Sequence, residues 1–381
     1  MLRPLPAIAP ITARPALDLG RPYGSPFAPL RRPRRPTPPT MPKATRTKPT
    51  AKQTEQAQQR RDEAAATLAA GVEHVAQDPE ALAAYLEFRA NFRRYSCRNA
   101  LFLSAQARTR GASARHFMGF RAWQGHGRQV QKGQRGYKVF APTLRKLTAE
   151  ECAARGREEG ARTVSGFRLA TVFDIDQTEA IEGREAEALV YASPIPELTG
   201  DDFEHVAADL VAVAQAIGYT VGTYAAHVRT AGGVCDAARR EIGVKEGPAD
   251  RRASTLAHEV VHALAHDGAD ARGIGKAARE IQAEGAAYLA CYVLGLDTST
   301  ASLPYLRSWA TGDTPEERAA SVQAQLGAID ALGWRLVELV EAHRSGTLTA
   351  DVARGAVAAS ATDADGVPRT AHADRPPVSS H

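Results

Sequence analysis

The sequence is poor in cysteine and has no long apolar run. Only four of its 381 residues are cysteines, and none form a Cys-x-x-Cys pair. This predicts neither a disulfide framework nor a thiolate zinc site. No segment approaches the roughly 20 consecutive apolar residues of a membrane-spanning helix, and prolines interrupt the N-terminus before the core of a signal peptide can form. We therefore expect a cytoplasmic protein that does not act in a membrane.

Acidic residues are missing from one long segment. Residues 88–149 contain 14 Lys or Arg and no Asp or Glu, whereas residues 174–297 contain 21 acidic and 10 basic residues. The net charge of +5 is therefore distributed very unevenly along the chain. A cationic segment of this length favours binding to an extended anion over mere solubility.

Both ends of the chain lack hydrophobic periodicity. Residues 1–60 are rich in Pro, Arg and Thr, and residues 346–381 are polar and rich in Ala, Asp and Pro. Such segments bury too little apolar surface to offset the entropy lost on ordering. We predict a disordered tail at each end. Met41 opens a second basic start, so two translation starts, Met1 and Met41, are open.

Between the tails, a composition shift with two prolines at residues 183–200 predicts a linker. Before it, residues 61–190 combine capped helices with short extended pieces broken by glycine, which predicts a small sheet packed on helices. After it, residues 195–345 predict a helix, two strands and three more helices, the last beginning at Thr314 in a capping box. The sequence thus predicts an α+β protein with two domains.

The stretch STLAHEVVHALAHDG, residues 254–268, carries a His-Glu-x-x-His motif. Residues four apart share one face of a helix, so His258 and His262 can direct two imidazoles at one point. A hydrolytic Zn²⁺ centre takes three protein ligands and keeps a fourth position for water. Glu259 is then placed as the general base that takes the proton of that water. Because such a motif arises by chance in roughly one chain in 50, its context has to decide.

The context favours a metal site. The motif lies on a predicted helix, follows a candidate edge strand at residues 239–244, and precedes a helix that carries Glu280 and Glu284. Glu284 lies centrally on the apolar stripe of that helix, and a buried carboxylate needs a partner that a metal would supply. We predict Glu284 as the third ligand and Glu280 as a supporting group. The reverse assignment stays open.

His266 continues the series of histidines. A straight helix rises 1.5 Å per residue and places His266 about 12 Å from His258, too far for one ion to bridge. We therefore expect His266 to be a cation at the helix C-terminus or a residue on the substrate side.

Aromatic residues are interleaved with the cations of residues 88–149. Single-stranded nucleic acid binds cations along its phosphates and aromatic rings on its unpaired bases. Phe92, Phe102 and Phe140 favour core positions, whereas the Gly-rich residues 123–138 favour a binding loop. A core position for Trp123 is the alternative. The predicted DNA-binding residues are Tyr95, Arg98, Trp123, Arg128, Lys132, Arg135, Tyr137 and Lys138.

Five segments together resemble one protein family. YSCRNALFLSAQA, GFRAWQGHGRQVQKGQRGYKVFAP and VFDIDQTEA resemble the N-terminal single-stranded-DNA-binding domain of ArdC-type antirestriction proteins, which also occurs in certain plasmid primases. STLAHEVVHALAHDG and QAEGAAYLACYVLGLDTSTASLPYLRSWA resemble the zincin-like metallopeptidase domain of that family. The five segments occur in the family's order and span roughly residues 61–345. Cys97 stands where the family pattern leads us to expect an aromatic residue.

The resemblance implies a protein of mobile DNA that binds single strands during transfer and counters host restriction. It implies His258, His262 and Glu284 as metal ligands and Glu259 as the catalytic base. Two functions remain open. In one, a zinc-dependent metallopeptidase is brought to a target, such as a host restriction protein, by its DNA-binding domain. In the other, the protein is a DNA-binding decoy or interaction protein whose zincin-like domain is structural.

Overall fold

The computed structural model describes residues 3–4, 50–93, 95–185, 202–224, 232–267, 273–298 and 314–355. Most of the two predicted tails, both possible start methionines and the predicted linker from residue 186 onward lie outside these residues. The described residues form a mixture of helices and sheets, which confirms the predicted α+β class. None of the described helices combines the length and apolarity needed to cross a membrane.

Three helices open the described chain: α1 (Ala51–Gln77), α2 (Pro79–Ala90) and α3 (Cys97–Thr109). The caps predicted for α2 and α3 are present, because Asp78 accepts from the backbone N–H of Glu80 and Ser96 accepts from that of Asn99. The start of α1 lies inside the segment predicted to be a tail. Thr50 and Gln53 form a capping box there, which begins the helix although its first turns carry no apolar stripe.

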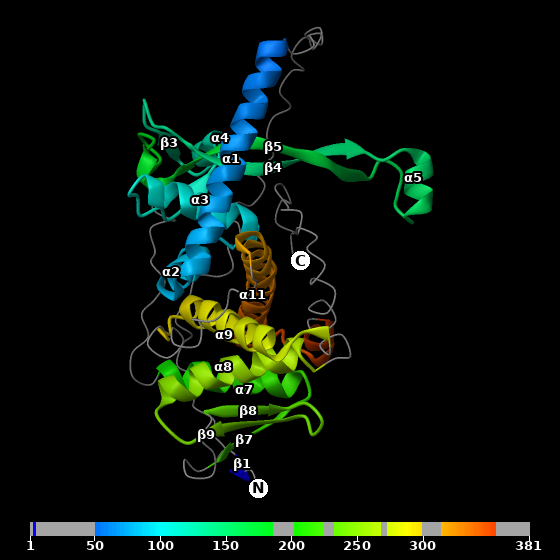
Figure 1. Cartoon of the computed structure of the whole chain (residues 1–381). Coiled ribbons are helices and arrows are strands. Elements are labelled where there is room, and N and C mark those ends of the chain that lie inside the picture. The colour runs from blue at the N-terminus through cyan, green and yellow to red at the C-terminus, as the bar shows by residue number, and fades with distance from the viewer. Residues whose placement is uncertain are drawn as a thin grey trace.

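A long antiparallel hairpin packs on these helices (Figure 1). Its strands are β4 (Tyr137–Lys146) and β5 (Arg162–Asp174), with β2 (Phe117–Met118) on the other edge of β5 and α5 (Ala149–Ala154) at the far end of the hairpin. Helix α3 holds β4 by its amides: Asn99 bonds the backbone N–H and C=O of Phe140, and Gln106 does the same at Lys138. Helix α4 (Phe120–Gly125) and the pair β3 (Arg128–Val130) and β6 (Thr178–Ala180) complete this region.

The second region is layered, with a sheet covered by helices (Figure 1). The sheet has the order β1-β7-β9-β8, built from β1 (Arg3–Pro4), β7 (Thr220–Tyr224), β9 (Glu241–Lys245) and β8 (Gly233–Asp236). Only β7 and β9 are parallel. Helices α7 (Asp202–Ala216) and α8 (Ala249–Ala265) lie on the sheet, and α9 (Lys276–Val293) and α11 (Pro315–Arg344) lie beyond them.

The predicted edge strand, residues 239–244, is an interior strand. It corresponds to β9, which lies between β7 and β8 and has three consecutive buried residues, as expected of a strand covered on both faces. The edge strand next to α8 is β8.

The two regions share a hydrophobic core. Apolar side chains of α1, α2 and α3, such as Leu82 and Leu101, pack in one cluster with Ile281 of α9 and Leu326 and Ile329 of α11. At its border the guanidinium of Arg89 pairs with the carboxylate of Asp330 at 2.5 Å, and the Arg89 side chain is only 3% exposed. Helix α11 therefore joins the first region to the helices of the second.

Candidate metal centre and nucleic-acid interface

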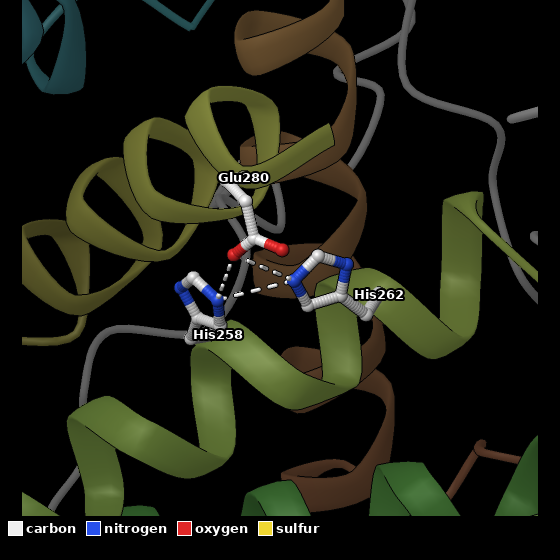
Figure 2. Close-up of side chains that lie close together, drawn as sticks. All are labelled: His258, His262 and Glu280. Atoms are coloured by element: carbon white, nitrogen blue, oxygen red, sulfur yellow. Dashed lines mark hydrogen bonds and ion pairs between the residues drawn. The ribbon is translucent and has the colours of Figure 1, made fainter. Parts of the chain in front are cut away.

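Helix α8 positions both histidines of the motif. Leu256, Val260 and Leu264 of α8 are buried in the core, which fixes the rotation of the helix about its axis. His258 and His262 then face α9, with their Nε2 atoms 3.1 Å apart (Figure 2). Ligand atoms at 2.0–2.1 Å from one tetrahedral ion lie about 3.4 Å from each other. The spacing of the imidazoles therefore fits a shared metal ion.

Glu280 of α9 supplies the third donor. Its Oε2 atom lies 3.6 Å from Nε2 of His258 and 3.6 Å from Nε2 of His262 (Figure 2). The donor atoms of all three residues lie within 4.8 Å of one another. Two imidazole nitrogens and one carboxylate are a donor set that binds Zn²⁺ and related divalent ions.

Glu284, predicted as the third ligand, lies on the other side of His258, and its role as a ligand stays a prediction. Its Oε2 atom lies 2.9 Å from Nδ1 of His258, on the side of the ring opposite to Nε2. Glu284 was predicted over Glu280 because it was expected to be the more buried of the two. Its side chain is indeed only 16% exposed, whereas the side chain of Glu280 is 51% exposed. The buried carboxylate finds its partner in an imidazole N–H, whereas the exposed one lies on the open side of the site. A ligand imidazole commonly donates its second N–H to a carboxylate in this way.

The two carboxylates of α9 favour a positive charge at the site. Burial lowers the pKa of His258, but its contacts with Glu280 and Glu284 outweigh it and raise this pKa to about 10. Burial and the neighbouring charge of His258 lower the pKa of His262. The close contact with His258 is also the main reason why the pKa of Glu280 falls to about 2. A divalent cation can replace the His258 proton and be balanced by the Glu280 charge.

Glu259 lies on the side of α8 that faces strand β8. It is 7% exposed, and burial raises its pKa to about 7, against the lowering effects of His258 and of a backbone hydrogen bond from Cys235. The strand approaches so closely at Gly233 that a Cβ atom there would lie 2.5 Å from Glu259 Oε1 and 2.6 Å from Thr255 Cγ2. The edge strand and the predicted base are thus in direct contact.

His266 lies beside the group without joining it. It caps the C-terminus of α8, and its Nδ1 atom lies 2.9 Å from Nδ1 of His262. Burial lowers the pKa of His266, which disfavours the charged form that a helix-terminal cation would need. Its Nε2 atom is hydrogen-bonded to Oε1 of Gln282. The sequence pattern did not indicate Gln282, because amide side chains do not belong to the histidine and carboxylate ligands of a zinc site.

Two of the three predicted stacking rings are buried, and the third is half-buried. Trp123 is fully buried and donates from Nε1 to the carbonyl of Phe173 at 2.9 Å. Tyr137 is 3% exposed and packs edge-on against Phe117. Tyr95 is half-buried and donates its hydroxyl to the carbonyl of Phe117. Trp123 and Tyr95 suit the small core of this region, because the polar atom of each ring donates to a backbone carbonyl there.

The predicted cations divide into two groups. Lys132 and Arg135 are exposed in the turn before β4, Arg98 is exposed over the ring of Phe140, and Lys138 is exposed with its Nζ atom 2.7 Å from Thr171 Oγ1. Arg128 instead braces the β3–β6 pair, because its guanidinium donates to the hydroxyl and carbonyl oxygens of Thr178.

Exposed aromatic rings occur elsewhere on the same region. Phe120 at the start of α4 is 48% exposed, and Phe167 on β5 is 44% exposed. Phe167 lies beside the exposed Arg168 and opposite Pro142 of β4. The sequence prediction missed Phe167 because it follows the acid-free segment, although its place between Gly166 and a cation resembles the stretch that was chosen.

Comparison with known proteins identifies the first region. Residues 54–173 match the family model of the N-terminal domain of the anti-restriction factor ArdC. This segment is similar to an ArdC N-terminal domain and is called the ArdC domain below. The predicted resemblance to ArdC-type antirestriction proteins is thereby confirmed. The ArdC domain contains the helices α2 and α3 and the β4–β5 hairpin, and the residues of the candidate metal centre follow it in the chain.

Relatives of the whole chain are distant. An uncharacterized protein of Bacillus anthracis is 27% identical over 276 residues, which are 64% of this chain and 46% of that protein. The chain thus spans about half the length of the curated relative it matches. Two crystal structures of antirestriction ArdC from plasmid R388, one metal-free and one Mn(II)-bound, are similar to it with a TM-score of 0.39 each. They are 20% and 18% identical and cover 70% and 69% of this chain and 86% and 89% of their own.

Proposed function

We propose that this protein is a single-stranded-DNA-binding, zinc-dependent metallopeptidase that acts in antirestriction. In this proposal the ArdC domain binds the DNA, and the centre between α8 and α9 cleaves a protein target such as a host restriction protein. The observation that carries the proposal is the convergence of His258 Nε2, His262 Nε2 and Glu280 Oε2 beside a buried Glu259. Packing between two helices does not by itself require these four ionisable groups to lie together.

The residues around the centre suit peptide hydrolysis. A zinc ion held by His258, His262 and Glu280 would act as a Lewis acid on a carbonyl group and on water. Glu259, whose pKa of about 7 matches neutral conditions, can accept a proton from water and pass it to the leaving amine. Strand β8 is the edge of its sheet among the described strands, and an extended peptide can add to such an edge by backbone hydrogen bonds.

The surface of the ArdC domain suits single-stranded nucleic acid. The exposed cations Arg98, Lys132, Arg135 and Lys138 can neutralise phosphates, and the exposed rings of Phe120 and Phe167 can stack on bases. These two rings take the role that was first assigned to Trp123 and Tyr137.

The test uses metal-loaded full-length protein, single-stranded DNA and a candidate restriction protein, with Glu259→Gln as the matched variant. We expect cleavage by the wild type and none by Glu259→Gln, which keeps the ligands and loses the base. Equal DNA affinity of the two proteins is the control. Equal cleavage by both proteins refutes the role of Glu259, and a wild type that binds zinc without cleaving any partner favours the decoy function.

A further inference from the structure

A chain of hydrogen bonds leads away from His262 across three helices. Nδ1 of His262 lies 2.9 Å from Nδ1 of His266, and Nε2 of His266 lies 3.0 Å from Oε1 of Gln282 in α9. The amide of Gln282 then donates from Nε2 to Oε1 of Gln325 in α11 at 2.9 Å. Gln282 is 8% exposed, and His262, His266 and Gln325 are half-buried.

With the two amides oriented as in the structure, the hydrogen bonds run in one direction. The amide oxygen of Gln282 can only accept, so Nε2 of a neutral His266 must carry the proton. Nδ1 of His266 is then an acceptor, and the proton between the two rings belongs to Nδ1 of His262. His262 therefore keeps its lone pair on Nε2, the atom that faces His258 and Glu280. His258 donates from Nδ1 to Glu284, and its Nε2–H lies 3.1 Å from the Nε2 lone pair of His262 until a metal ion displaces that proton.

We infer that Gln282, acting through His266, positions His262 as a metal ligand by fixing its Nδ1–H tautomer. The inference rests on the proposed metal centre and adds three positioning residues to it: His266, Gln282 and Gln325. A carboxylate orients one ligand imidazole and an amide relay orients the other. An imidazole whose second nitrogen has lost its partner commonly binds its metal about 10- to 100-fold more weakly.

The first test is zinc affinity, measured by competition with a chromophoric chelator. Gln282→Met keeps the shape of the side chain and removes the acceptor, and we expect it to weaken zinc binding by about 10- to 100-fold. Gln323→Met is the matched control, because Gln323 is an exposed residue of α11 outside the relay. A Gln282→Met protein that binds zinc as tightly as the wild type overturns the inference, and thermal melts of the metal-free variants show whether both are folded.

The second test needs no core variant. Long-range ¹H–¹⁵N NMR spectra of the metal-free wild type, labelled on histidine, report which ring nitrogen carries each proton. We expect the Nδ1–H form for His262 and the Nε2–H form for His266, assigned by the signals lost in His262→Gln and His266→Gln. The Nδ1–H form or a doubly protonated ring at His266 overturns the relay. A wild type that binds no zinc refutes the metal centre itself. The NMR result tests the relay alone, so the two failures can be told apart.

Discussion

Replacing Trp123 by alanine should destabilise the protein without acting directly on DNA binding. The ring is fully buried and its Nε1–H bonds a backbone carbonyl at 2.9 Å. Burying about 200 Å² of apolar surface at about 25 cal/mol per Å² contributes about 5 kcal/mol, and measured losses for buried Trp→Ala substitutions are about 3–5 kcal/mol. At about 2–4 °C per kcal/mol, the melting temperature should fall by about 6–20 °C.

The matched substitution is Phe167→Ala. Phe167 is 44% exposed, so its loss should change the melting temperature little, but it should weaken binding of a fluorescent single-stranded oligonucleotide by about 1–3 kcal/mol if the ring stacks on a base. Thermal melts and oligonucleotide titrations of both variants, the latter well below either melting temperature, measure the two effects. If Trp123→Ala melts like the wild type and loses DNA affinity, the assignment of Trp123 to the core is refuted.

Three further outcomes follow from the site and the charged surface. Gly233→Ala should leave zinc affinity unchanged and slow hydrolysis by about 100-fold, because its Cβ atom would displace the Glu259 carboxylate by about 1 Å. Unaltered hydrolysis would show that the contact between Gly233 and Glu259 does not position the base. Zinc binding at pH 7 should release about one proton, because the raised pKa of His258 keeps that ring protonated until the metal replaces the proton. Calorimetry in two buffers of different ionisation enthalpy measures the number of protons released. A binding enthalpy that is independent of the buffer would contradict this prediction. Lys132→Ala should reduce the slope of log affinity for single strands against log salt by about 0.7, and an unchanged slope would place Lys132 away from the phosphates.

The sequence was sufficient to place the two histidines of the motif but not the two carboxylates of α9 around them. Helical periodicity alone places His258 and His262 on one face, and both are found there with their Nε2 atoms together. The choice between Glu280 and Glu284 depends on how α9 crosses α8, which sequence spacing does not contain. The relay through Gln282 and Gln325 depends on the same crossing and on α11, and neither amide belongs to a ligand motif.

The sequence predicted the exposed cations of the proposed DNA-binding surface but not its exposed aromatic rings. The acid-free composition of residues 88–149 is a local property and survives folding, so Lys132 and Arg135 are exposed as expected. Whether an aromatic ring in the same segment is exposed to solvent depends on which side chains pack against the small sheet. Trp123 and Tyr137 are both buried, and Tyr137 belongs to the core cluster there, while Phe167 on the β4–β5 hairpin is exposed.

The most direct test of the metal centre compares zinc affinity in Glu280→Ala, Glu284→Ala and the wild type. The wild type should bind one zinc ion, Glu284→Ala should bind it about 10- to 100-fold more weakly through the loss of a supporting carboxylate, and Glu280→Ala should lose more than that because a ligand is gone. Zinc binding that survives Glu280→Ala unchanged and disappears in Glu284→Ala would contradict the site described between α8 and α9.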